Sequence, residues 1–239
     1  MLEINNYNSS ILHEISFSLN ENENLIILGQ NGAGKSTLAK VLSNLIENDK
    51  VKLFNENMNK LDDSKRALYI NYIPPKLSIF DEYITLREFL ELSFVTKVDN
   101  EKIDEVIKLL NLKKLEDKYC KSFSSGEKQL LLLASSIMHD AKITIFDELT
   151  ANLDISRLKE VYEIFNSDLL KQKIVITHNL DLAYALKFKI LFLKDGIIEF
   201  FGSNDEFFEA VNLKRFYKDT ILKLDNHLVV NLWKFFYIF

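Results

Sequence analysis

The distribution of glycine constrains this chain more than any other feature of its sequence. The 239 residues include six glycines, and three of them, Gly29, Gly32 and Gly34, fall within six positions. Because proteins contain roughly 7% glycine on average, a cluster in such a glycine-poor chain marks backbone that cannot accept a side chain. The segment 29–36 reads Gly-Gln-Asn-Gly-Ala-Gly-Lys-Ser and fits the phosphate-loop pattern G-x-x-x-x-G-K-[ST].

The residues on either side support this interpretation of the loop. The apolar run 24–28 predicts a buried strand before it. Apolar residues with helical spacing follow it, at Leu38, Val41, Leu42, Leu45 and Ile46. In a strand–loop–helix unit, backbone N–H groups and the positive end of the helix dipole bind phosphate oxygens. The predicted nucleotide contacts are Gly29, Gln30, Asn31, Gly32, Ala33, Gly34, Lys35, Ser36 and Thr37.

Within this loop, two side chains have expected roles of their own. Lys35 is expected to reach the β- and γ-phosphates, and Ser36 to offer its hydroxyl to Mg²⁺. Two later predicted strands are each followed by polar side chains that could act together with Lys35 and Ser36. Asp147 and Glu148 follow the apolar run 142–146, at the end of a strand that faces ligand in a parallel sheet.

We expect the two acidic residues after the run 142–146 to take part in the reaction with the nucleotide. Asp147 is expected to hold Mg²⁺ through water, and Glu148 to act as general base on an attacking water. His178 follows the strand predicted at 173–177, which should neighbour Asp147, so we favour a γ-phosphate contact for it over a structural role. The other histidines, His13, His139 and His227, have no such context.

Strands and helices alternate along the remaining chain. Helical spacing of apolar residues predicts helices within 86–119 and over 155–169, and two apolar runs around Lys194-Asp195-Gly196 predict a hairpin. This alternation indicates an α/β fold in which helices cover both faces of a mostly parallel sheet. The length suits one domain with a subdomain.

Composition excludes several classes of function. A net charge of −5 gives no basic excess for general nucleic-acid binding. One cysteine, Cys120, excludes a disulfide framework and favours a reducing compartment. No run reaches the roughly 18 apolar residues of a membrane span. The apolar segment 228–239 is interrupted by Asn231 and Lys234 and is expected to pack on the core or on a partner.

The segment 121–129, Lys-Ser-Phe-Ser-Ser-Gly-Glu-Lys-Gln, resembles the signature sequence of ABC-type ATPases. Other motifs follow in that family's order. Tyr7 matches the aromatic residue that stacks on adenine, the segment 151–154 matches a loop that contacts the opposite subunit, and His178 matches the switch histidine. The resemblance extends from residue 2 to about residue 215.

The resemblance implies a complete architecture. A phosphate-loop, RecA-like core would occupy 25–85 and 141–200, with an N-terminal antiparallel β subdomain. An inserted helical subdomain would span about 86–140, and a C-terminal tail about 203–239. The whole chain, 1–239, would then be one ABC ATPase domain.

The resemblance also implies partners. ATP and Mg²⁺ would lie between two ATPase subunits in a head-to-tail dimer, in which Ser124, Ser125, Gly126 and Glu127 of one subunit meet the γ-phosphate held by the other. Without the resemblance, this Ser-Ser-Gly turn would be interpreted as a helix cap. Integral membrane permease subunits would bind beside the 74–88 loop and the helical subdomain, and no nucleic-acid partner is expected.

The expected transporter is a bacterial importer of iron complexes (siderophore or haem) or of cobalamin, working with a substrate-binding protein. The subunit would lie at the cytoplasmic side of the inner membrane as a peripheral protein. An exporter or a lipoprotein-release system is the alternative, and a non-transport ABC ATPase is a more remote one.

Three positions depart from the family pattern. Ser125 stands where the signature has its first glycine, and Glu127 stands where it has glutamine. The family also has a loop glutamine that touches Mg²⁺, and the corresponding position here is Pro75 or Lys76. Neither side chain supplies an amide oxygen, so we expect the loop 74–76 to act in coupling rather than in metal binding.

Overall fold

The computed structural model describes residues 1–151, 153–218, 220–224 and 227–231. Its centre is a six-stranded sheet in the order β10-β9-β3-β8-β7-β6, in which all neighbouring strands are parallel except the antiparallel pair β10 and β9. The strands are β3 (Leu25–Gly29), β6 (Ile70–Ile73), β7 (Ile143–Asp147), β8 (Gln172–Ile176), β9 (Lys189–Lys194) and β10 (Ile197–Gly202). The predicted α/β fold with a mostly parallel sheet is confirmed.

Both faces of this sheet are buried, as its sequence pattern predicts. On β3, Leu25 and Ile27 belong to one apolar cluster, whereas Ile26 and Leu28 belong to the other. One cluster is completed by the helices α3, α5, α6 and α7, and the other by α1 and the N-terminal strands. A strand buried on both faces has a continuous apolar sequence rather than an alternating one.

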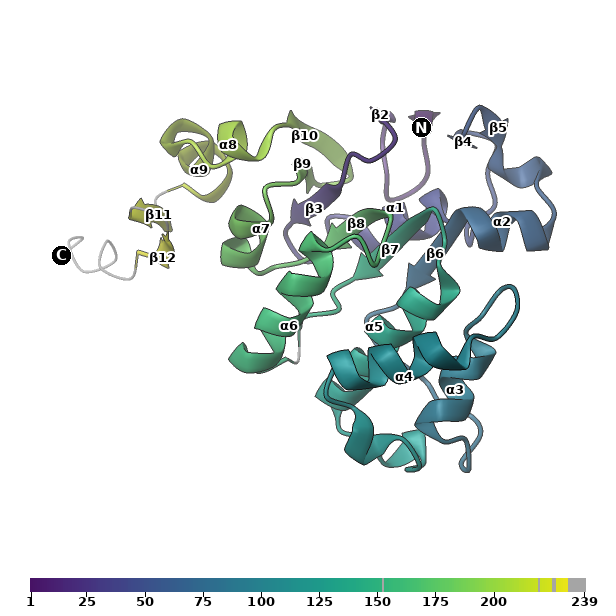
Figure 1. Cartoon of the computed structure of the whole chain (residues 1–239). Coiled ribbons are helices and arrows are strands. Elements are labelled where there is room, and N and C mark those ends of the chain that lie inside the picture. Colours follow the sequence, from purple (N-terminus) through teal and green to yellow (C-terminus); the bar gives the residue numbers. More distant parts are fainter. Residues whose placement is uncertain (152, 219, 225–226, 232–239) are drawn as a thin grey trace.

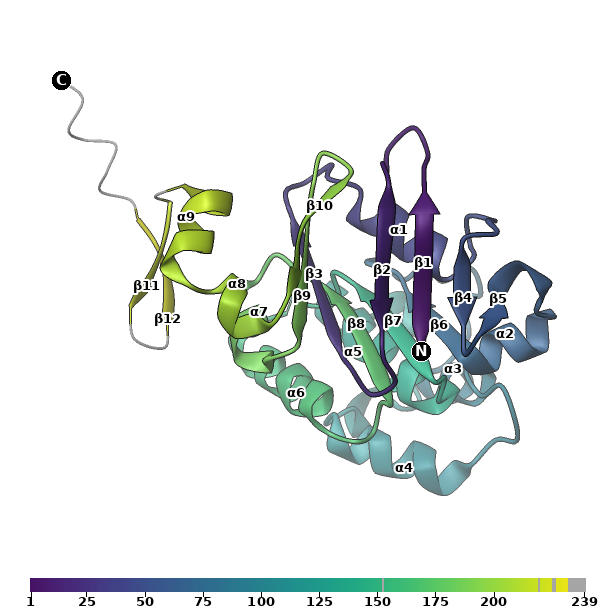
Figure 2. The same ribbon diagram turned by 90° about the horizontal axis from the view of Figure 1, so that it is seen from above.

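The N-terminal strands form a separate antiparallel sheet in the order β2-β1-β4-β5, which lies over the central sheet (Figure 2). This sheet agrees with the N-terminal antiparallel subdomain that the family resemblance implies. Its strands are β1 (Leu2–Tyr7), β2 (Ile15–Leu19), β4 (Val51–Leu53) and β5 (Glu56–Asn57). Helix α1 (Lys35–Leu42) lies between the two sheets, and α2 (Asp63–Tyr69) leads into β6.

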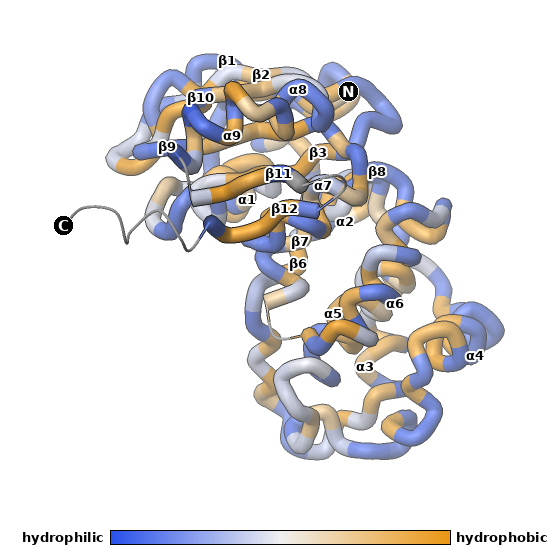
Figure 3. The backbone as a smooth tube through the Cα atoms, turned by 90° about the vertical axis from the view of Figure 1, so that its left-hand side faces the viewer, coloured by the Kyte–Doolittle hydropathy of each residue, from blue (hydrophilic) through white to orange (hydrophobic). Residues whose placement is uncertain are grey.

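A helical unit projects from the central sheet after β6 (Figure 1). It contains α3 (Leu86–Leu92), α4 (Asn100–Leu109) and α5 (Ser125–His139). Ten consecutive residues of α5, 129–138, are buried, so this helix connects the unit to the sheet. The hydropathy tube shows polar residues on the outward side of α4 (Figure 3).

The rest of the chain covers one side of the sheet and extends beyond it. Helices α6 (Ile155–Asn166) and α7 (Leu180–Leu186) pack on the sheet, and α8 (Asn204–Phe207) and α9 (Ala210–Tyr217) follow β10. A hairpin of β11 (Ile221–Leu224) and β12 (His227–Val230) contacts α7 and α9. The apolar segment 228–239 is expected to pack on the core or on a partner, and its first residues belong to this hairpin. Residues 232–239 lie outside the described part of the chain.

Two predicted helices end earlier than their apolar spacing suggests. Helix α1 ends at Leu42 rather than near Ile46, because Asn44 adopts a φ of 57° and turns the chain, which leaves Leu45 62% exposed. Likewise, α6 ends at Asn166, where the buried Lys173 ammonium donates hydrogen bonds to carbonyls at its C-terminal end. Within the described residues, no helix is long and apolar enough to span a bilayer.

Candidate functional site: a phosphate loop beside a carboxylate strand end

The glycine loop lies between β3 and α1, and two of its glycines are fixed by their surroundings. Gly29 has a φ of 153°, and a Cβ there would stand 2.2 Å from the carbonyl oxygen of Leu193 on β9. Gly34 caps α1 with a φ of 101°, and a Cβ there would meet the side chain of Leu12 at 2.7 Å. The need for glycine at these two positions is thus explained by positive φ angles and by close contacts that leave no room for a side chain.

Lys35 is the first residue of α1 and folds back into the loop. Its side chain is nearly buried, and its Nζ donates hydrogen bonds to the carbonyls of Gly29 and Gln30, both at 2.9 Å. Burial lowers the pKa of Lys35, while the nearby carboxylates of Glu148 and Asp147 oppose this shift. The loop therefore holds a cation whose direct acceptors are neutral carbonyls that phosphate oxygens can replace.

The loop borders a small pocket of about 270 Å³, which brings the predicted loop residues together with the strand end. The residues around it are Ile11, Asn31, Gly32, Gly34, Lys35, Ser36, Thr37 and Glu148. Gln30 and Ala33 belong to the same turn, in which the Ala33 N–H donates to the Gln30 carbonyl at 3.2 Å. Backbone N–H groups, a lysine and a hydroxyl around one hollow are suited to bind a polyphosphate.

Asp147 ends β7 and is fully buried, and both of its carboxylate oxygens accept hydrogen bonds. Ser36 Oγ donates to Oδ1 at 3.1 Å, and the Tyr72 hydroxyl donates to Oδ2 at 2.8 Å. Burial and the contact with Asp147 raise the pKa of Tyr72, so its hydroxyl stays protonated and remains a donor at neutral pH.

The oxygen atoms of Ser36 and Asp147 match the preference of Mg²⁺ for hard oxygen ligands. Across the described segments, no three His, Cys, Asp or Glu side chains gather as a metal cluster. Mg²⁺ commonly takes one or two protein oxygens and completes its shell with phosphate and water. The residues present therefore fit a magnesium ion that arrives with a nucleotide.

Glu148 follows β7 in a left-handed conformation, with a φ of 54°. Its N–H donates to the carbonyl of Ile176 at 3.0 Å, which holds this turn against the end of β8. The carboxylate Oε1 lies 2.7 Å from Nε2 of His178, and both side chains are partly exposed. An outlying backbone conformation at a strand end is typical of a functional residue. The structure thus pairs the predicted base with the predicted switch histidine.

The turn 124–127 lies elsewhere, at the N-terminus of α5. Ser124 caps the helix by accepting from the N–H of Glu127 at 3.3 Å, and the Glu127 carboxylate accepts from the N–H of Ser124 at 2.8 Å. These hydrogen bonds lower the pKa of Glu127, so the carboxylate stays charged at neutral pH. Ser125 and Gly126 form the first turn. None of these four residues lines the phosphate-loop pocket of the same chain.

The loop after β6 packs against that same helix end. Pro75, Lys76 and Leu77 border a hollow of about 320 Å³ with Ser125, Lys128 and Gln129 of α5. The Gln129 amide is buried, and neither its nitrogen nor its oxygen has a hydrogen-bond partner among the described residues. The predicted coupling loop is therefore in contact with the predicted signature helix.

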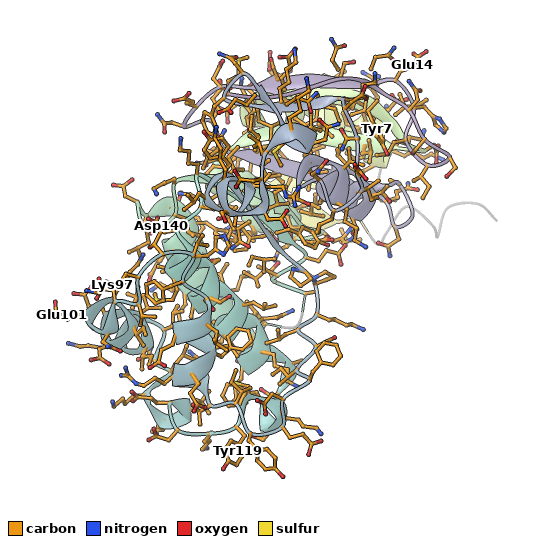
Figure 4. The ribbon with its side chains drawn as sticks, turned by 90° about the vertical axis from the view of Figure 1, so that its right-hand side faces the viewer. Tyr7, Glu14, Lys97, Glu101, Tyr119 and Asp140 are labelled. Atoms are coloured by element: carbon orange, nitrogen blue, oxygen red, sulfur yellow. The ribbon has the colours of Figure 1, made fainter. Side chains whose placement is uncertain are left out.

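The Tyr7 side chain is too buried for an adenine ring to stack on it easily. Its side chain is 8% exposed and packs in the apolar cluster beneath the N-terminal sheet, in the upper part of Figure 4. Ile11, which is 46% exposed, lies on the phosphate-loop pocket instead. Stacking of Tyr7 on adenine stays a prediction.

The segment 151–154 precedes α6. Asp154 caps that helix by accepting from the N–H of Arg157 at 2.9 Å, and Ala151 is exposed. Asn152 lies outside the described residues. The contact of this segment with another subunit stays a prediction.

A larger hollow of about 870 Å³ lies away from this chemistry, beside α4 and the start of α6. Two arginines and three lysines are among the residues that line it, but Arg87 pairs with Asp104 and Glu116, and Arg157 pairs with Glu160. Both arginines are thus used in structural ion pairs, and the glycine loop remains the better phosphate site despite its smaller pocket.

Sequence reasoning missed two residues of this region, Tyr72 and Ile11, whereas Gln129 is part of the signature segment 121–129. Tyr72 carries a visible signal, a hydroxyl near the end of an apolar run and just before two prolines. Its contact with Asp147 depends on the pairing of β6 with β7, which joins residues more than 70 positions apart. Ile11 carries no comparable signal.

Comparison with known proteins identifies the class to which this site belongs. The family model described as ABC transporter matches residues 12–151. A putative ABC transporter ATP-binding protein of Clostridium tetani is 33% identical over 196 residues, which are 79% of this chain and 44% of that protein. A zinc import ATP-binding protein of Buchnera aphidicola is 30% identical over 215 residues, 86% of each chain.

A solved structure supports the fold. An ATP-binding cassette captured as a dimer after hydrolysis, with ADP and phosphate bound, superposes with a TM-score of 0.71 at 22% identity, over 85% of this chain and 99% of that one. With the glycine loop, the carboxylate strand end and these matches together, the chain belongs to the ABC transporter family and is an ABC ATPase. It spans less than half the length of the Clostridium relative.

Proposed function

We propose that this chain is the ATP-binding and ATP-hydrolysing subunit that powers an ABC transporter. The observation that carries the proposal is the Glu148 carboxylate, which lies 2.7 Å from His178 and borders the pocket that contains Lys35. A base, a switch group and a phosphate-binding cation thereby converge where the γ-phosphate of ATP and its attacking water would meet.

Each residue has a distinct part in the proposed reaction. The loop N–H groups and Lys35 bind the β- and γ-phosphates, and Ser36 and Asp147 hold Mg²⁺, which when bound supplies charge neutralisation on the phosphates. Glu148 takes a proton from the attacking water as general base. His178, held beside Glu148, contacts the γ-phosphate and keeps the carboxylate oriented.

A second copy of the chain completes the site in this proposal. Ser124, Ser125, Gly126 and Glu127 lie away from the pocket of their own chain, and a helix N-terminus is an anion-binding element. A head-to-tail dimer would bring this turn to the γ-phosphate held by the partner's loop. The solved cassette with ADP and phosphate is a dimer, which supports this arrangement.

Integral membrane permease subunits are the proposed partners of the helical unit and the 74–88 loop. This region exposes large apolar side chains at Phe80, Tyr83, Leu92 and Tyr119, which are 93%, 71%, 77% and 51% exposed. Tyr83 and Tyr119 pack edge to face, and Tyr119 lies at the far end of the unit in Figure 4. An exposed apolar patch of this kind is typical of a protein interface, and the subunit would then be peripheral to the cytoplasmic side of the membrane.

For the transported substrate we propose import of a metal complex, of the iron-siderophore, haem or cobalamin class, with a substrate-binding protein. The Buchnera relative is named for zinc import, which supports import of a metal species without selecting among these classes. Export and lipoprotein release use the same ATPase chemistry and remain the alternative. A non-transport ABC ATPase is a further one.

The test is to co-purify the chain with the membrane protein encoded beside it and to measure ATPase activity with and without candidate ligands. We expect ligand-stimulated activity from the wild-type complex. The Glu148→Gln complex should bind ATP with unchanged affinity but hydrolyse it at least about 100-fold more slowly, because the amide cannot accept the proton. Near-wild-type hydrolysis by Glu148→Gln would show that the base is another group.

A further inference from the structure

Asp147 is held by side chains from two different elements. Ser36, in the first turn of α1, donates to Oδ1 at 3.1 Å, and Tyr72, on β6, donates to Oδ2 at 2.8 Å. The carboxylate has no exposed surface, so solvent does not supply these hydrogen bonds in their place. Within the described chain, these two hydroxyls are the side-chain donors that reach it.

The fold fixes Tyr72 beside Asp147. Strand β6 pairs with β7 in parallel, with Tyr72 opposite Ile145 and Ile73 opposite Phe146. Two consecutive prolines, Pro74 and Pro75, follow the strand and restrict its C-terminal end, because each proline has a φ fixed near −65°. The half-buried ring of Tyr72 therefore has little freedom to leave the carboxylate.

A carboxylate that serves a metal must present one oxygen in a fixed direction. A charge-assisted hydrogen bond to the other oxygen is an effective way to hold it, and such outer partners tune metal affinity strongly. The Tyr72 hydroxyl binds Oδ2, which leaves Oδ1 on the side of Ser36 and the glycine loop. The side chains of Pro75 and Lys76 supply no amide oxygen here, so the orientation of Asp147 matters more than it otherwise would.

We propose that Tyr72 is a positioning residue that orients the Asp147 carboxylate and thereby sets the affinity of the nucleotide site for Mg²⁺. This inference rests on the proposed ATP site and adds a residue to it. Tyr72 acts through Asp147 and does not touch the nucleotide or the ion. It adds a role that neither the glycine loop nor the catalytic carboxylate provides.

The direct test is Tyr72→Phe, which removes the hydroxyl and keeps the ring. Binding of a fluorescent ATP analogue is titrated with Mg²⁺, and separately measured in EDTA. We expect the half-saturating Mg²⁺ concentration to rise about 10-fold, the lower end of the effect of losing an outer partner of a metal ligand. Nucleotide affinity in EDTA should be unchanged.

A matched control exists on the preceding helix. Tyr69 also donates its hydroxyl to a carboxylate, Glu56 Oε1 at 3.1 Å, but far from the nucleotide site. Tyr69→Phe should leave both titrations unchanged. A double-mutant cycle adds the second readout: in an Asp147→Asn background, Tyr72→Phe should no longer change the Mg²⁺ dependence, because its effect passes through the carboxylate.

Three results would overturn the inference. One is an unchanged Mg²⁺ dependence in Tyr72→Phe, and another is an equal loss of nucleotide affinity with and without Mg²⁺, which marks a merely structural role. The third is a full 10-fold effect that persists in the Asp147→Asn background. If the wild-type protein binds no ATP under any condition, the proposed function fails as well, and this outcome is distinct from the other three.

Discussion

Two helix N-termini in this molecule are assigned to the same ligand but are built differently. Helix α1 begins after Gly34, which has no side chain to cap it, and its first turn contains no acidic residue. Helix α5 begins after Ser124, whose side chain and the Glu127 carboxylate form a reciprocal capping box. The N–H groups of α1 are thus left for a ligand, whereas some of those at α5 already have partners.

This difference indicates which of the two helix ends contacts ATP first. The α1 end also has Lys35 in its first turn and a pocket beside it, so it can bind a phosphate within one chain. At α5, the charged Glu127 stabilises the free helix but disfavours a phosphate close to the same N-terminus. We infer that ATP binds at α1 first and that the α5 turn joins only when a second chain approaches.

The largest effect in this comparison is expected from Lys35→Ala. Removing the cation should weaken ATP binding about 100-fold, because a charge-assisted hydrogen bond contributes up to about 3 kcal/mol. Isothermal titration with ATP checks this. Binding within threefold of wild type would show that the loop N–H groups suffice without the lysine.

Lys173 provides a matched control for that experiment. It is as buried as Lys35, burial also lowers its pKa, and its Nζ likewise donates to two backbone carbonyls, of Phe165 and Ser167. Lys173 lies on β8, and its ammonium reaches the C-terminal end of α6 rather than the phosphate loop. Lys173→Ala should destabilise the fold but leave ATP affinity per folded molecule unchanged.

The smallest effect is expected from Glu127→Gln. Glutamine keeps the capping box but removes the negative charge beside the proposed phosphate position. ATP-dependent dimerisation should then reach its midpoint at about threefold lower ATP, and the gain should shrink at high salt, because partly exposed charges are screened. A midpoint that rises instead would mean that the carboxylate has a binding role.

The phosphate half of the site could be predicted because its signals are local. Gly29 to Ser36 are contiguous, glycine is rare elsewhere, and Asp147 and Glu148 directly follow a continuous apolar strand. Parallel-sheet geometry then places the carboxyl end of β8, and with it His178, next to β7. The fold class follows from the same alternation of strands and helices.

The features that could not be predicted depend on contacts between residues that are far apart in the sequence. The bond between Tyr72 and Asp147 requires the register of β6 on β7, and the burial of Tyr7 requires the irregular pairing of β1 with β2. Helix ends were also misjudged, since Asn44 turns the chain although apolar spacing continues to Ile46. The N-terminal antiparallel sheet was expected from the family resemblance and not from a local pattern.

The central claim is that each ATP site is shared between the α1 end of one chain and the α5 end of another. Light scattering of the Glu148→Gln protein with ATP and Mg²⁺ tests it most directly. We expect a mass twice that of the 27.9 kDa chain, a monomer when Ser124→Arg is added, and a retained dimer with Ser203→Arg, which breaks an equivalent capping box at α8. A Ser124→Arg protein that still dimerises, or a Glu148→Gln protein that stays monomeric at saturating ATP, would contradict it.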